Sequence, residues 1–248
     1  MSSGRPLKIP KNPSVLVLEP NSEKLCRQKL SLANQVGTEV QRLGFDVQVV
    51  QTTTHDELKE TLMALAERRR TFHAIVVISH SNEDGIEIAR DRAVRGDGFV
   101  PWTAFTGYLS PFEPQRLLLV ACEAGRSSPA KALFTGLPRL SRVYASPVLM
   151  TKAQAMLLFE SLPVLLGVNP PSSEDLRWQR FRLGMRAGGQ VFEWTPQDMD
   201  QPEGNDMFDW LADKAKEPLE NLPTAINKNE SMRELTELVE QVHDLFRK

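Results

Sequence analysis

Residues 73–79 read HAIVVIS, and residues 116–121 read RLLLVA. Both are short runs of mostly apolar side chains, and each is followed at once by a residue that could carry chemistry. A short, continuously apolar run predicts a strand that is buried on both faces of a sheet. Such a sheet needs helices on each of its faces, so these two runs favour an α/β fold.

The rest of the chain alternates between strand-like and helix-like patterns. Three more strands are predicted, at residues 14–19, 45–50 and 142–145. Helices are predicted at residues 22–43, 55–68, 101–109, 129–134 and 152–166. Because strands that alternate with helices form parallel sheets with a helix layer on each side, we expect a three-layer α/β sandwich with a mainly parallel sheet.

Residues 169–173 (NPPSS) interrupt this alternation. We therefore expect a flexible leader at residues 1–13, the α/β core at residues 14–168 and a C-terminal extension at residues 169–248. The extension contains a predicted edge strand at residues 188–194 and ends in an amphipathic helix. The apolar face of that helix has two open interpretations: it packs back onto its own domain, or it docks an activating protein.

Composition argues against several functional classes. The 248 residues include 30 basic and 32 acidic side chains, a net charge of -2, so no overall positive field attracts nucleic acid or an anionic membrane. The apolar stretches are far shorter than a membrane span and the amino terminus is polar, which predicts a cytoplasmic protein. Two cysteines without CxxC spacing and four scattered histidines predict no metal site, disulfide framework or cofactor.

Two reactive side chains follow the two most apolar strands. His80 comes directly after residues 73–79, and Cys122 directly after residues 116–121. Groups that act on a ligand gather at the carboxyl edge of an open parallel sheet. If the two strands are neighbours, the imidazole and the thiol face one crevice, as a cysteine nucleophile and its base do. The backbone N–H groups of Cys122 and Ser81 are then candidates to stabilise an oxyanion.

Each reactive residue also has a simpler interpretation. A cysteine after an apolar strand is often only a small buried side chain, and a histidine at a strand end often satisfies local hydrogen bonds. Cys26, in the helix predicted at residues 22–43, is expected to be such a buried residue. The joint position of His80 and Cys122 at two strand ends is what favours catalysis.

The order of these motifs resembles that of the caspase-like cysteine peptidases, and most closely the bacterial CHAT group. The similarity spans residues 14–168 and consists of SHS at 79–81, GIEIA at 85–89, VPW at 100–102 with Leu109, and LLLVACEAG at 117–125. The resemblance implies a regulated bacterial effector, often one in defence, that hydrolyses polypeptides. It also implies that Cys122 attacks the peptide carbonyl, that His80 protonates the leaving amine, and that the N–H groups of Ser81 and Cys122 bind the oxyanion.

Two positions depart from the family pattern. The family usually has glycine after the catalytic histidine, where this chain has Ser81, and relatives that cut after basic residues often carry a carboxylate where this chain has Val120. Glu19, at the end of the first strand, is the acidic residue that we expect near a substrate side-chain pocket, which would favour a basic P1 residue. The alternative is that Glu19 only interacts with the helix start at Asn21 and Ser22.

A second function is open as well. Residues 15–21, 84–89 and 145–147 are similar to segments of response-receiver domains, which have the same alternation of strands and helices. A receiver needs an aspartate at the end of its third strand, where this chain has His80, and a lysine before the late proline, where this chain has Ser146. A degenerate receiver, or an inactive peptidase that serves as a scaffold, is therefore the alternative to an active enzyme.

Overall fold

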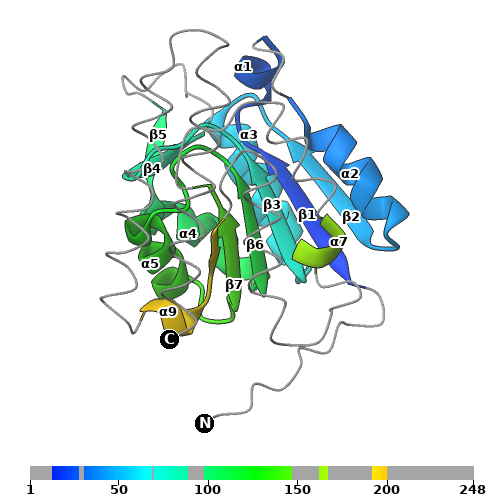
Figure 1. Ribbon diagram of the computed structural model, residues 1–248. Coiled ribbons are helices and arrows are strands. Elements are labelled where there is room, and N and C mark those ends of the chain that lie inside the picture. The colour runs from blue at the N-terminus through cyan, green and yellow to red at the C-terminus, as the bar shows by residue number, and fades with distance from the viewer. Residues whose placement is uncertain are drawn as a thin grey trace, which may run out of the picture.

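A six-stranded sheet lies at the centre of the molecule (Figure 1). The structure is a computed structural model that describes residues 13–27, 31–68, 70–88, 98–146, 162–166 and 192–199. The strand order is β2 (Asp46–Gln51), β1 (Ser14–Glu19), β3 (Ala74–Ile78), β6 (Arg116–Val120), β7 (Arg142–Ala145) and β8 (Phe192–Trp194). The first five strands are parallel, and β8 is antiparallel to β7. The predicted α/β fold and the predicted pairing of β3 with β6 are confirmed.

Helices cover both faces of this sheet. On one face, α1 (Ser22–Arg27), α2 (Ala33–Arg42) and α7 (Leu162–Leu165) share a core with Val17 and Val76. On the other face, α3 (His55–Glu67), α4 (Trp102–Leu109) and α5 (Ser127–Gly136) share a core with Leu16 and Leu117. Successive strand side chains point to opposite faces, so only continuously apolar strands can supply both cores. The described residues therefore form three layers, in which each buried Leu or Val contributes about 1.5–3 kcal/mol.

The helix predicted at residues 22–43 is in fact two helices, α1 and α2. The carboxylate of Glu19, at the end of β1, accepts hydrogen bonds from the backbone N–H groups of Leu32 and Ala33, both at 3.1 Å. The first N–H groups of a helix have no partner inside it, and a carboxylate stabilises them. Glu19 therefore favours a new helix start at Ala33. The single-helix prediction was wrong because it used the spacing of apolar residues, which does not reveal this polar contact between β1 and α2.

A small antiparallel hairpin, which the sequence patterns do not predict, follows β3. It consists of β4 (Gly85–Glu87) and β5 (Phe99–Pro101), and it leads into α4 and the 3-10 helix η1 (Ser110–Phe112). A bridge between Ser81 and Ile86 joins the hairpin to the segment after β3. Position 85 requires glycine, because a Cβ there would lie 2.4 Å from the carbonyl oxygen of Val100. The hairpin thus lies directly beside the residues that follow β3.

Strand β8 belongs to the predicted C-terminal extension, yet it forms the edge of the core sheet. The predicted strand at residues 188–194 is confirmed for residues 192–194. Trp194 is completely buried, and the short helix α9 (Pro196–Met199) follows it against α5. The final amphipathic helix with its docking role, His243, the leader up to residue 12, and residues 152–161 of the predicted apolar helix lie outside the described residues.

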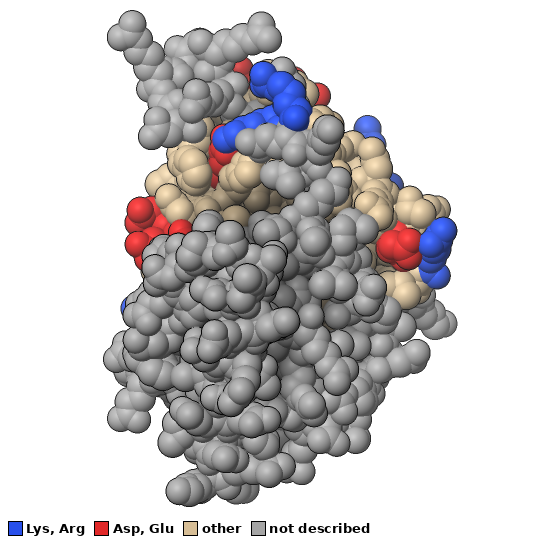
Figure 2. Space-filling view, turned by 45° about the horizontal axis from the view of Figure 1, so that its top comes forward, with Lys and Arg blue, Asp and Glu red and all other residues tan. Residues whose placement is uncertain are grey.

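Charged side chains of both signs are interspersed on the surface. Figure 2 shows Lys and Arg side chains beside Asp and Glu side chains on the described part of one face. This mixture agrees with the net charge of -2. No helix among the described residues is long and apolar enough to cross a membrane.

Candidate active site

His80 and Cys122 leave neighbouring strands at the same level. In the parallel register of β3 and β6, Ile78 pairs with Val120, and each candidate residue comes two positions after its strand's paired residue. The alignment continues past the strands, because the N–H of Ser79 donates to the carbonyl of Val120 over 3.3 Å. The backbone therefore brings both residues to the carboxyl edge of adjacent strands.

Two contacts join the segments that carry these residues. The hydroxyl of Ser81 donates a hydrogen bond to the carbonyl oxygen of Cys122. The guanidinium of Arg126, four residues after Cys122, lies 3.9 Å from the carboxylate of Glu83, three residues after His80. The hydrogen bond spans the two segments directly, so they lie against each other.

Both candidate side chains are partly exposed, unlike the strands that precede them. Every residue of β3 and β6 is buried, whereas His80 and Cys122 retain contact with solvent. A thiol buried among apolar side chains is inert, while a partly exposed thiol beside a base can react. The simpler interpretation of Cys122 as a fully buried small residue therefore does not apply.

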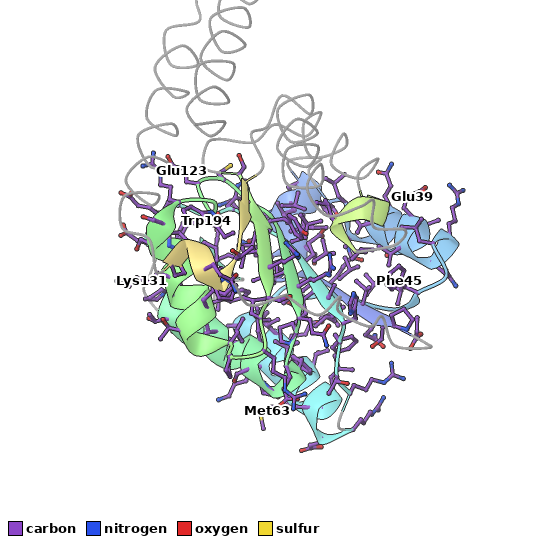
Figure 3. The ribbon with its side chains drawn as sticks, turned by 60° about the horizontal axis from the view of Figure 1, so that its bottom comes forward. Glu39, Phe45, Met63, Glu123, Lys131 and Trp194 are labelled. Atoms are coloured by element: carbon purple, nitrogen blue, oxygen red, sulfur yellow. The ribbon has the colours of Figure 1, made fainter. Side chains whose placement is uncertain are left out.

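A tight turn leads from Cys122 toward α5. Glu123 has φ of 53°, in the left-handed region that costs a non-glycine residue about 1–3 kcal/mol. The N–H of Gly125 donates to the carbonyl of Ser146 beyond β7, and the carbonyl of Gly125 accepts from the indole N–H of Trp194, each over 2.8 Å. Figure 3 shows Glu123 at the rim of the molecule and Trp194 inside it. Neutral hydrogen bonds from two strands thus fix this turn.

The environment of His80 favours its neutral form. Burial lowers the pKa of the imidazole below the ordinary value of about 6.5. The carboxylate of Glu87 acts against this lowering of the pKa, and the ammonium group of Lys24 adds to it. Because the net direction is downward, the ring is neutral at neutral pH and can accept a proton.

Glu87 is a buried carboxylate that the sequence patterns do not single out. It accepts hydrogen bonds from Nζ of Lys24 at 2.8 and 2.7 Å and from Nδ2 of Asn21 at 3.2 Å. Its neighbours Ile86 and Ile88 are buried core residues. A glutamate between two buried isoleucines is the signal that could have identified it, since a charge in an apolar run needs a partner.

The predicted oxyanion role of the Ser81 and Cys122 N–H groups stays a prediction. Ser81 is buried, and its hydroxyl is bonded to the carbonyl of Cys122. The turn after it is shaped by Oδ1 of Asn82, which accepts from the N–H groups of Asp84 and Gly85 at 3.0 and 2.9 Å. The serine side chain thus links the segments that carry His80 and Cys122, which glycine, without a side chain, could not do.

Glu19, the predicted substrate-binding residue, has no exposed surface. Besides the two N–H groups at the start of α2, its carboxylate accepts from the hydroxyl of Ser31 at 2.8 Å and from Nε2 of Gln51 at 3.0 Å. It therefore caps α2, and not the helix start at Ser22 that the alternative interpretation named. These four hydrogen bonds account for Glu19 without a substrate.

Of the remaining cysteine and histidines, Cys26, His55 and His73 lie within the described residues. Cys26 is exposed on α1, so the prediction that it is buried was wrong: the short helix α1 turns it toward solvent. Nε2 of His55 lies 2.6 Å from the hydroxyl of Tyr108, and Nε2 of His73 lies 3.1 Å from the carbonyl of Leu166. Within the described residues, no group of three or more His, Cys, Asp or Glu side chains could hold a metal ion.

No protein-family model matches this chain, and no curated protein matches it. The arrangement of Cys122, His80 and their supporting residues is the physical basis for a functional proposal.

Proposed function

We propose that this chain is a cysteine endopeptidase in which Cys122 is the nucleophile and His80 is the general base and acid. The observation that carries the proposal is the register of β3 and β6, in which Ile78 pairs with Val120 and both candidate residues follow two positions later. The hydrogen bond from Ser81 to the carbonyl of Cys122 supports it, because it joins the two segments. Partial exposure of both side chains leaves them accessible to a substrate.

The chemistry needs only these two side chains and water. A free thiol has a pKa of about 8.5, so at neutral pH the nucleophilic thiolate must be formed with the help of a base. The neutral imidazole of His80 takes the proton from Sγ, and the thiolate attacks the peptide carbonyl. The imidazolium then gives that proton to the leaving amine, which breaks the C–N bond and leaves a thioester. Water, deprotonated by His80, hydrolyses the thioester and restores the thiol.

The tetrahedral intermediate carries a negative oxygen that needs hydrogen-bond donors. We assign this role to the N–H groups of Ser81 and Cys122, which belong to the two segments joined at the sheet edge. The turn at Glu123 and the hydrogen bonds of Gly125 support the assignment, because they hold the Cys122 segment in one conformation. Such donors stabilise an oxyanion best when they are fixed before the reaction.

The finer identity that we propose is a caspase-like peptidase of the CHAT type, acting on polypeptides as a regulated effector. The mainly parallel sheet with helices on both faces is consistent with this class. Ser81 departs from the glycine usual in the family, but its hydroxyl bonds to the segment of the nucleophile. This contact gives the serine a structural purpose within the same catalytic design.

The strand order also fits a second candidate, a signalling or scaffold module without catalysis. Taken in chain order, the five parallel strands are arranged 2-1-3-4-5, the order of flavodoxin-like and receiver domains. The order alone therefore does not distinguish the two. His80 stands where a receiver would carry its phosphate-accepting aspartate, so only a degenerate receiver fits this chain.

Fluorogenic peptides with Arg, Lys or Asp at P1 test the peptidase proposal. We expect the wild-type chain to cleave at least one of them, Cys122→Ala to abolish cleavage, and His80→Ala to lower kcat/KM by about 100-fold or more. Cys26→Ser is the matched control for a thiol and should leave the rate unchanged, because the side chain of Cys26 is exposed and does not follow β3 or β6. Cleavage that survives Cys122→Ala would overturn the proposal.

A further inference from the structure

A buried ion pair lies beside the segment that carries His80. The side chain of Glu87 is 3% exposed, and that of its partner Lys24 is 39% exposed. Both carboxylate oxygens of Glu87 accept from Nζ of Lys24, and one also accepts from Asn21. A buried carboxylate has a large desolvation cost, which these charged and polar donors offset. The pair is therefore a fixed feature of this edge.

The backbone of Glu87 is hydrogen-bonded to His80 and to Ser79, the residue before it. The N–H of Glu87 donates to the carbonyl of His80 over 2.8 Å, and the hydroxyl of Ser79 donates to the carbonyl of Glu87 over 2.5 Å. The bridge between Ser81 and Ile86 continues this pairing. The hairpin that carries Glu87 is thus hydrogen-bonded to the backbone of the His80 segment.

We propose that the Lys24–Glu87 pair is a positioning element of the catalytic dyad, in which the buried carboxylate anchors the His80 segment and favours its imidazolium while Lys24 limits that effect. This inference rests on the proposed peptidase function and deepens it. The imidazolium forms only after the thiol has lost its proton. A negative charge that stabilises it therefore assists the first step, and a positive charge opposes it.

Charged and titratable side chains lie on several segments of the described edge. Glu87 belongs to β4, Lys24 to α1, and Cys122 and Glu123 to the turn after β6. Glu83 follows His80 and is paired with Arg126. Of these groups, Glu87 raises the pKa of His80 and Lys24 lowers it. Removing the charge of Glu87 should therefore lower the pKa of His80, and removing the charge of Lys24 should raise it. A merely structural role would not produce these opposite shifts.

The test is an NMR titration of the His80 ring in the full chain, with His80→Gln used to assign its signal. Glu87→Gln should lower the titration midpoint of His80, and Lys24→Gln should raise it. Glu39→Gln is the matched control, because Glu39 is a partly exposed carboxylate on α2 that pairs with Arg42, and it should leave the midpoint unchanged. The double variant Glu87→Gln/Lys24→Gln leaves neither partner unpaired, so it serves if a single variant fails to fold. Its midpoint should lie below that of the wild type and above that of Glu87→Gln.

A second readout separates this inference from the peptidase proposal. In a peptide-cleavage assay at neutral pH, we expect Glu87→Gln to lower kcat, because the negative charge that stabilises the His80 imidazolium is removed. The expected loss is about threefold or more, on a scale where one pKa unit corresponds to a factor of ten in proton affinity. If the two variants shift the His80 midpoint in opposite directions but the protein cleaves no peptide, the peptidase proposal is wrong and the charge coupling is supported. If cleavage is normal and the His80 midpoint does not shift, or shifts in the same direction in both variants, the coupling is wrong and the peptidase proposal is supported.

Discussion

The two halves of the candidate site are built from different interactions. The His80 segment lies beside a buried ion pair, Lys24 with Glu87. The Cys122 turn is fixed by neutral hydrogen bonds: the N–H of Gly125 donates to the carbonyl of Ser146 beyond β7, and the indole N–H of Trp194 donates to the carbonyl of Gly125. The difference indicates that the half that holds the base responds to charge and pH, whereas the half that holds the nucleophile responds to packing.

The largest expected effect on stability belongs to the half that carries Cys122. Trp194→Ala removes a fully buried indole and leaves the carbonyl of Gly125 without its donor, so we expect the free energy of unfolding to fall by about 3–5 kcal/mol. Trp194→Phe keeps most of the apolar volume and should cost less, about 1–3 kcal/mol. Urea unfolding measures both values. Equal losses in the two variants would mean that packing contributes little to the turn.

The charged half should show an asymmetry between its two partners. Lys24→Gln leaves the carboxylate of Glu87 buried without its counter-charge, and we expect a loss of about 2 kcal/mol at pH 7. Glu87→Gln should cost less, about 1 kcal/mol, because the partly exposed Lys24 side chain can turn into water. The same unfolding experiment at high and low salt measures this difference. A larger loss of unfolding free energy in Glu87→Gln than in Lys24→Gln would contradict the claim that Glu87 is the partner that cannot reach water.

The contact between the halves gives a smaller effect. Ser81→Ala removes the hydroxyl that donates to the carbonyl of Cys122, with an expected cost of about 1 kcal/mol. Amide hydrogen exchange in residues 122–125 should become faster, because the turn loses its link to the His80 segment. Ser110→Ala, an exposed serine at η1, is the control and should change neither quantity. Unchanged exchange in Ser81→Ala would show that the two segments are joined by other contacts.

A histidine at the opposite edge serves as a reference for the pH response. Burial lowers the pKa of His73, so between that lowered pKa and the ordinary value the unfolded chain binds more protons than the folded chain. Stability is then lost as pH falls from 7 toward 5, and His80 adds a loss of the same sign. His73→Gln retains a hydrogen-bond donor without the titration, so its free energy of unfolding should fall less over this range. An identical pH dependence in wild type and variant would refute this sign.

Local patterns predicted the sheet well, because a buried strand is a run of consecutive apolar residues. Ser14–Glu19 and Arg142–Ala145 match their predicted bounds, and the pairing of β3 with β6 follows from their being consecutive long strands. The helix predicted to begin at residue 55 is confirmed as α3, and the side chain of Thr54 caps it by accepting from the N–H of Glu57 three residues later. These features depend on neighbours in sequence.

Features that depend on distant contacts were not predicted. The break between α1 and α2 depends on Glu19, and the hairpin of β4 and β5 has strands of only three residues. In the candidate site, the positions of His80 and Cys122 followed from strand order. The role of Glu87 did not, because its partner Lys24 lies 63 positions away.

The reaction rates of the two thiols with iodoacetamide test the central claim most directly, that His80 activates Cys122 in a shared cleft. Exposure alone predicts that Cys26, which is exposed, reacts faster than the half-buried Cys122. Activation by His80 predicts the reverse order at pH 7, and it predicts that His80→Ala slows Cys122 without affecting Cys26. If Cys122 reacts more slowly than Cys26 and is indifferent to His80→Ala, the two residues do not form a dyad.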